Sequence, residues 1–190
     1  MFLGTSAQTW REFGYELDAT LHAVVANDLA CNLVDGLRKS WFAPPLWLKQ
    51  GLAYWYSRRA DERFTVYAKG TLRNFDDDSW KWEPRVRGLV GNQFAVPWKT
   101  MMEWQTVADM QPQDHMIAWS RVSWLLSQKG ADLHAFLMVL SDPVLSVPVP
   151  DRPKVVLERQ PKAFAAGFGK TADELEEAWK QFVLKTYPRK

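Results

Sequence analysis

Apolar residues recur at helical spacing along most of the chain, and this pattern predicts a mainly α-helical fold. The clearest segment begins at Asp18 or Thr20, either of which can cap a helix that extends to about Arg38. It carries five aliphatic residues at strict i+4 spacing: Leu21, Val25, Leu29, Leu33 and Leu37. We expect these five side chains to form one stripe that faces the core.

A second helix is predicted after the Pro44–Pro45 pair, which cannot continue the first helix and can open a new one at about Leu46. Its expected apolar face contains four residues: Leu48, Leu52, Trp55 and Tyr56. Helical patterns return in residues 97–110, 112–130, 131–142 and 171–187. The last of these opens with Thr171 and Glu174 at the spacing of a capping box.

Two segments break the helical pattern. Residues 64–96 combine a stretch of strand character with a polar loop that contains aromatic residues, so a few short strands are predicted there. Residues 143–153 are rich in proline and predict a loop before the C-terminal helices. With residues 1–18 as an N-terminal lead, we expect residues 1–190 to form a single domain, a helical bundle.

The composition is that of a globular protein, with 47% hydrophobic and 24% charged residues. The net charge of +2 and the lack of a basic run predict no nucleic-acid partner. No stretch approaches the roughly 18 apolar residues of a membrane span, and the N-terminus lacks the pattern of a signal peptide. If the chain is complete, we expect it to be cytoplasmic, and its single cysteine excludes an internal disulfide.

Two short segments carry the candidate chemistry. The first helix contains the sequence NDLAC, which places Asn27, Asp28 and Cys31 at positions i, i+1 and i+4. The second contains PLWLKQGLAYW, in which Gln50 follows Cys31 by 19 positions. These segments resemble the gluzincins, zinc metallopeptidases of the peptidase MA-like group, whose corresponding segments are H-E-x-x-H and P-x-W-L-x-E-G-L-A-x-[YW]. The resemblance covers roughly residues 20 to 186 and implies a bundle like the active-site helix and C-terminal subdomain of that family.

The resemblance implies that Asn27, Cys31 and Gln50 stand at the three metal-ligand positions, and that Asp28 stands at the general base. All four residue types differ from the family pattern. The neutral amides of Asn27 and Gln50 are poor zinc ligands, and a lone thiolate does not complete a tetrahedral site. The shorter Asp28 side chain misplaces a general base. The expectation is a catalytically inactive domain with no metal or other cofactor.

Such a domain would retain its fold for binding or scaffolding, with a peptide or protein as a possible partner. The expected cleft lies between the two helices and includes four further residues: His22, Trp47, Gly51 and Tyr54. Gluzincin domains carry a sheet before the active-site helix, whereas fewer than 20 residues precede the helix here. We therefore expect the helical part of such a domain without its sheet, unless residues 64–96 supply strands.

Two other functions remain open. One is a working zinc peptidase with an altered site, in which Cys31 acts with His22 or another histidine. The other is a carbohydrate- or peptide-binding module built on the 11 tryptophans. Five of them fall at helical positions that favour burial: Trp47, Trp55, Trp119, Trp124 and Trp179. Four lie near predicted loops or helix starts, where exposed rings can stack on a ligand: Trp80, Trp82, Trp98 and Trp104.

Overall fold

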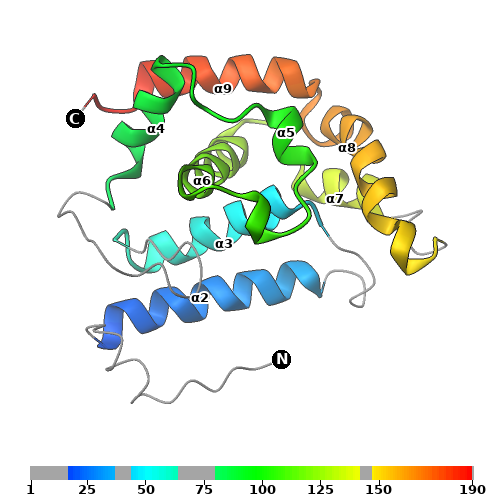
Figure 1. Ribbon diagram of the computed structural model, residues 1–190, viewed down its shortest axis with the longest axis horizontal. Coiled ribbons are helices and arrows are strands. Elements are labelled where there is room, and N and C mark those ends of the chain that lie inside the picture. The colour runs from blue at the N-terminus through cyan, green and yellow to red at the C-terminus, as the bar shows by residue number, and fades with distance from the viewer. Residues whose placement is uncertain (1–16, 37–43, 64–79, 142–146, 190) are drawn as a thin grey trace.

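The computed structural model describes residues 17–36, 44–63, 80–141 and 147–189, and the regular structure in these ranges is helical (Figure 1). The mainly α-helical prediction is therefore confirmed. The elements are α2 (Leu17–Asp35), α3 (Leu46–Ala60), α4 (Trp82–Gly91), α5 (Trp98–Met102), η1 (Val107–Asp109), α6 (Pro112–Ser127), α7 (Leu133–Ser141), η3 (Val149–Asp151), α8 (Arg152–Phe168) and α9 (Ala172–Thr186).

Helix α6 lies at the centre of the bundle, as Figure 1 shows. Helix α3 packs on one side of α6 and α4 packs on another, while α9 lies across α4. Helices α7 and α8 form a pair at one end. Helix α2 forms the outermost layer, where it runs antiparallel along α3. The two helices that carry the candidate residues are thus direct neighbours.

Several helix ends follow from local sequence. Thr171 accepts a hydrogen bond from the Glu174 backbone amide at 3.2 Å, and Glu174 accepts one from the Thr171 amide at 2.7 Å. This pair is the predicted capping box of α9. Helix α8 ends at Gly169, whose φ of 64° is a left-handed conformation that favours glycine. Arg87 on α4 donates hydrogen bonds to the Val183, Leu184 and Tyr187 carbonyls at the end of α9.

Large aromatic side chains form much of the core. The ring of Trp47 on α3 lies 5.6 Å from that of Trp98 and 5.8 Å from that of Phe164, between centroids. Phe136 on α7 packs against Trp47 at 6.0 Å. These contacts join α3, α5, α7 and α8, and aromatic pairs at such separations add about 1 kcal/mol each beyond area burial.

The predicted core stripe of α2 is wrong for the three residues whose side chains the structure describes, while the Leu21 side chain and Leu37 lie outside the described part. Val25, Leu29 and Leu33 are 45%, 51% and 71% exposed, whereas Ala30 and Val34 are buried. The reason is that α2 packs mainly along α3 and therefore buries one narrow face. Ala23, Ala30 and Val34 are buried on that face, while Val25, Leu29 and Leu33 lie away from it.

Other local predictions also need correction. Residues 64–79 lie outside the described residues, but the remaining part of the predicted strand region, residues 80–96, contains helix α4 and no strand. The helical pattern of residues 97–110 becomes two short pieces, α5 and η1. In the proline-rich loop, residues 147–153 include η3 and the start of α8, where Pro153 occupies the first turn and so leaves the helical hydrogen bonds intact.

Candidate functional site

The candidate residues of α2 divide between its two sides. Asn27 and Cys31 are half-buried and share the side of the helix that carries buried Ala30 and Val34, which packs against α3. Asp28 is exposed. An α-helix turns about 100° per residue, so Asp28 cannot share the direction of Asn27. The structure thus directs two of the three α2 positions towards α3.

Cys31 lies in a partly apolar environment beside an ion pair. The Lys49 ammonium of α3 lies 2.6 Å from the Asp35 carboxylate of α2. Burial raises the pKa of the Cys31 thiol to about 11, and the charge of Lys49 only partly opposes this increase. The thiol is therefore protonated at neutral pH, whereas a metal ligand must be a thiolate. A cationic ammonium group beside it further disfavours a metal cation.

Gln50 is half-buried on α3, directly after Lys49. Its neutral side chain supplies no charge to balance a divalent ion. Within residues 17–36, 44–63, 80–141 and 147–189, no group of three or more His, Cys, Asp or Glu side chains is placed to hold a metal ion. The residues at the predicted ligand positions do not fit zinc.

His22 does not join Cys31. It is exposed near the start of α2, nine residues before the cysteine. That interval corresponds to about 13 Å along the axis and about half a turn around it. The imidazole and the thiol therefore lie on opposite sides of the helix, too far apart to share a metal ion or a proton.

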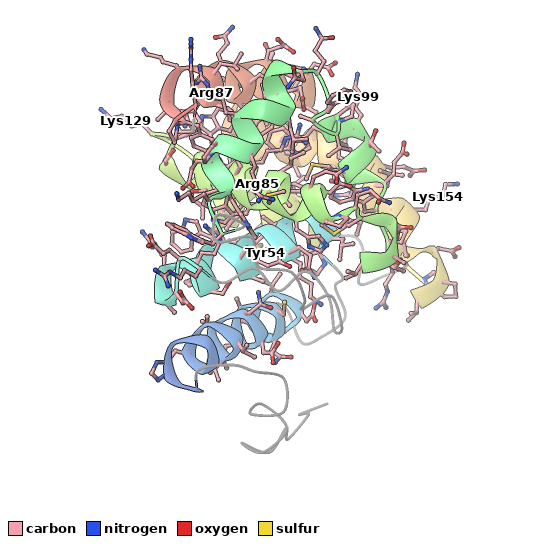
Figure 2. The ribbon with its side chains drawn as sticks, turned by 60° about the vertical axis from the view of Figure 1, so that its left-hand side comes forward. Tyr54, Arg85, Arg87, Lys99, Lys129 and Lys154 are labelled. Carbon is pink, nitrogen blue, oxygen red and sulfur yellow. The ribbon has the colours of Figure 1, made fainter. Side chains whose placement is uncertain are left out.

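The other predicted cleft residues pack into the interior. Trp47 is fully buried, and its indole Nε1 donates a hydrogen bond to Gln160 Oε1 at 2.9 Å. Gly51 lies where α3 meets α6, because a Cβ there would come within 2.7 Å of the Ala118 carbonyl oxygen. Tyr54 is also buried and lies within the body of the molecule (Figure 2). Among the described residues, these three positions belong to packing contacts of α3 and form no open groove.

Tyr54 belongs to a buried polar contact that the sequence pattern does not predict. Its hydroxyl lies 3.1 Å from His115 Nδ1 on α6, with the two rings edge to face. Burial lowers the pKa of His115 to about 4, so the imidazole is neutral at pH 7. Nearby on α6, the Ser120 hydroxyl lies 2.9 Å from the Tyr187 hydroxyl and accepts a hydrogen bond from Trp179 Nε1 at 3.0 Å.

A second missed feature is a buried ion pair. Arg121 on α6 is fully buried and donates to Glu176 of α9 at 2.5 Å and to the Val96 carbonyl at 2.8 Å. Its guanidinium lies 4.4 Å from the ring centroid of Trp179. Desolvation lowers the pKa of Arg121 to about 10 while Glu176 opposes the decrease, so the group stays charged at neutral pH. An i, i+4 apolar pattern gives no signal for such a pair, since its partner lies 55 residues away.

Most of the tryptophans in the described residues are buried in the core. Burial is confirmed for four of the five at helical positions: Trp47, Trp119, Trp124 and Trp179. Three of the four near predicted loops are also buried, so the alternative of exposed rings is wrong for them: Trp82, Trp98 and Trp104. The two half-buried rings, Trp55 and Trp80, each lie beside a cationic side chain, and Arg59 lies 3.9 Å from the centroid of Trp55.

Charged side chains are dispersed over the surface. Lys99, Lys129 and Lys154 are exposed and point outward from different parts of the molecule (Figure 2). Lys99 is paired with Asp173 at 2.9 Å. These three lysines form no common cationic face.

An open cavity lies at one end of the α2–α3 pair. Its volume is about 150 Å³, and it is bounded by the ends of α2, α3 and α5 and by the first part of α8. The Asp35–Lys49 ion pair lies at this cavity, together with apolar side chains that include Trp104 and Val156. A local sequence pattern does not reveal this cavity, because its walls come from four separate segments.

The described helices include none that is long and apolar enough to cross a bilayer. No protein-family model, curated protein sequence or solved structure matches the chain. The family resemblance therefore rests on the sequence alone, chiefly on the NDLAC and PLWLKQGLAYW segments, and it remains a prediction.

Proposed function

We propose that this chain is a catalytically inactive, metallopeptidase-like helical domain that functions by binding. Two observations support the proposal. The NDLAC and PLWLKQGLAYW segments resemble the family's motifs, and they lie on adjacent antiparallel helices. The helix pair supplies the frame of a metal centre, while its side chains supply neither the charge nor the donors that zinc requires.

The observation that carries the proposal is the environment of Cys31. A thiol with a pKa of about 11 holds its proton at neutral pH, and its closest cationic neighbour, Lys49, is fixed by Asp35. Burial makes this thiol a poor nucleophile, and a metal ion here would have to displace the thiol proton next to the Lys49 ammonium. The buried Cys31 side chain therefore fits a packing role, whereas a peptidase would need a reactive group at this position.

The alternatives receive less support. An altered peptidase that uses Cys31 with His22 would need the two groups on one side of α2, and the helix separates them. A tryptophan-based binding module would need accessible rings, and the interior takes up Trp82, Trp98 and Trp104. A binding role through the cavity beside Asp35 and Lys49 remains compatible with every contact described above.

Metal analysis of the protein purified without chelator tests the inactive assignment. We expect far less than one equivalent of zinc by inductively coupled plasma mass spectrometry, because the part of the chain that the structure describes places no group of three or more His, Cys, Asp or Glu side chains to hold a metal ion. The matched variants are Cys31→Ser and Gln50→Ala, with Gln128→Ala as a control on a different helix end. About one equivalent of zinc that disappears in the first two variants and persists in the control would contradict the proposal.

A further inference from the structure

The cavity beside Asp35 and Lys49 has two chemically distinct parts. One part is apolar, with walls that include Leu46, Trp104, Val156 and Leu157. The other part is ionic, since the Lys49 ammonium and the Asp35 carboxylate lie 2.6 Å apart beside it. A ligand that matches both parts must carry an apolar group next to two opposite charges.

The volume limits the size of the apolar group. The whole cavity, with its apolar and ionic parts together, has a volume of about 150 Å³, so its apolar part can hold at most one benzene-sized group. That size corresponds to one leucine or phenylalanine side chain and is too small for a sugar ring with its substituents or for several residues of a peptide. The apolar part of the ligand is therefore a single hydrocarbon group.

Gln160 gives the cavity a fixed polar wall. Its Oε1 accepts a hydrogen bond from Trp47 Nε1 at 2.9 Å, and its Nε2 donates to the Met102 carbonyl at 3.0 Å. These two bonds hold the amide in place. Gln160 is 1% exposed, so the wall adds a polar group at a defined position.

The ion pair remains available to a ligand. The Lys49 and Asp35 side chains are 25% and 47% exposed, and ion pairs at such exposure contribute little to stability. The Lys49 ammonium has three N–H donors, of which Asp35 takes one. A ligand carboxylate can therefore bind Lys49 while a ligand ammonium binds Asp35, without loss of the contact between the two side chains.

We propose that this cavity binds a free apolar α-amino acid as its zwitterion. The ammonium and carboxylate of such a ligand share one carbon, which matches two opposite charges that lie in direct contact. A peptide carries its two terminal charges at opposite ends and cannot satisfy both at once. This inference rests on the binding role proposed above, but it is independent of the kinship with metallopeptidases and of metal content.

A titration monitored by two-dimensional NMR tests the ligand class. The probes are L-leucine, 4-methylpentanoate, which lacks the ammonium, and 3-methylbutylamine, which lacks the carboxylate, each added to about 10 mM as suits weak binding. We expect L-leucine to shift the Trp104 indole signal and to bind at least tenfold more tightly than either analogue. Any other ranking of the three affinities, or no saturable shift with L-leucine, would overturn the proposal.

Two variants test the location. Lys49→Met removes the cation and should weaken L-leucine binding at least tenfold, whereas Lys99→Met, which breaks an exposed ion pair on α5, should leave it unchanged. Leu157→Trp should block the half-buried apolar wall and abolish binding, with circular dichroism to verify the fold. Unchanged affinity in Lys49→Met would exclude this site. A zinc-containing protein that still binds L-leucine would contradict the inactive assignment alone.

Discussion

Helices α2 and α6 show how differently two apolar helices can be used. Helix α2 carries the more regular aliphatic pattern, and yet Val25, Leu29 and Leu33 are exposed. Helix α6 carries charged and polar residues, including His115 and Arg121, and buries nearly all of its surface. The difference follows from position, because α6 lies at the centre of the bundle and α2 forms its outer layer.

The comparison shows that burial follows the number of packed neighbours more closely than it follows hydrophobic periodicity. A central helix must bury its polar groups, and each buried group then needs a partner. Glu176 accepts a hydrogen bond from Arg121, and the Tyr54 hydroxyl lies within hydrogen-bond distance of His115. An outer helix needs one narrow face, which small residues such as Ala30 supply.

The largest expected effect comes from removing the buried cation of α6. Arg121→Met should destabilise the protein by about 3–5 kcal/mol, because it removes the fully buried partner of Glu176 and leaves that carboxylate with the partly exposed Lys180 as a cationic neighbour. Urea unfolding measures this difference, and Lys99→Met serves as the exposed control. A loss below 1 kcal/mol would mean that α6 does not depend on the pair.

The second effect is a pH dependence that comes from His115. Its folded pKa of about 4 lies below its ordinary value of 6.5, so below pH 6.5 the unfolded chain binds a proton that the native state does not. This stability is complete above pH 6.5 and is lost as the pH falls towards 4, by about 3 kcal/mol in total. Urea unfolding at several pH values should show a smaller slope in His115→Gln, and equal slopes would show that His115 is not buried in its neutral form.

The third effect concerns the contact between α3 and α6. Gly51→Ala should cost about 1–3 kcal/mol, because the new methyl group meets Val122 and the Ala118 carbonyl. Gly88→Ala is the matched control, since it lies in a helix with open space around it and should be neutral or slightly stabilising. Similar thermal midpoints for the two variants would argue against close packing at Gly51.

The smallest effect separates the two faces of α2. Val34→Ala should cost about 1–2 kcal/mol, as expected for a buried valine, while the neighbouring Leu33→Ala should change stability by less than about 0.5 kcal/mol. Urea unfolding of both variants measures the difference. A larger loss for Leu33→Ala would place the aliphatic stripe in the core after all.

Much of the fold could be predicted from local sequence. Pro45, Pro112 and the Thr171–Glu174 box mark helix starts through their own backbone chemistry, so α3, α6 and α9 begin close to where they are expected. The prediction failed at α4, where the dense polar and aromatic residues resemble a loop, and on the outward face of α2. Both failures concern tertiary neighbours, which a local pattern does not contain.

Less of the candidate site could be predicted. The sequence placed Asn27, Cys31 and Gln50 on two adjacent helices, and the described structure places these helices side by side. It could not reveal that Lys49 and Asp35 form an ion pair beside Cys31, since the two residues are 14 positions apart on different helices. The cavity was also missed, because residues more than 100 positions apart line it together.

Restoration of the family's ligands tests the proposed kinship of the α2–α3 pair. The triple variant Asn27→His, Cys31→His and Gln50→Glu should bind one equivalent of zinc tightly enough to retain it through gel filtration, because three suitable donors would then converge. The control replaces Cys31→His by Asn32→His, which turns the second imidazole about 100° around the helix. One equivalent in the restored variant and none in the control is the expected result. A folded triple variant that retains no zinc would show that these positions never shared a metal centre.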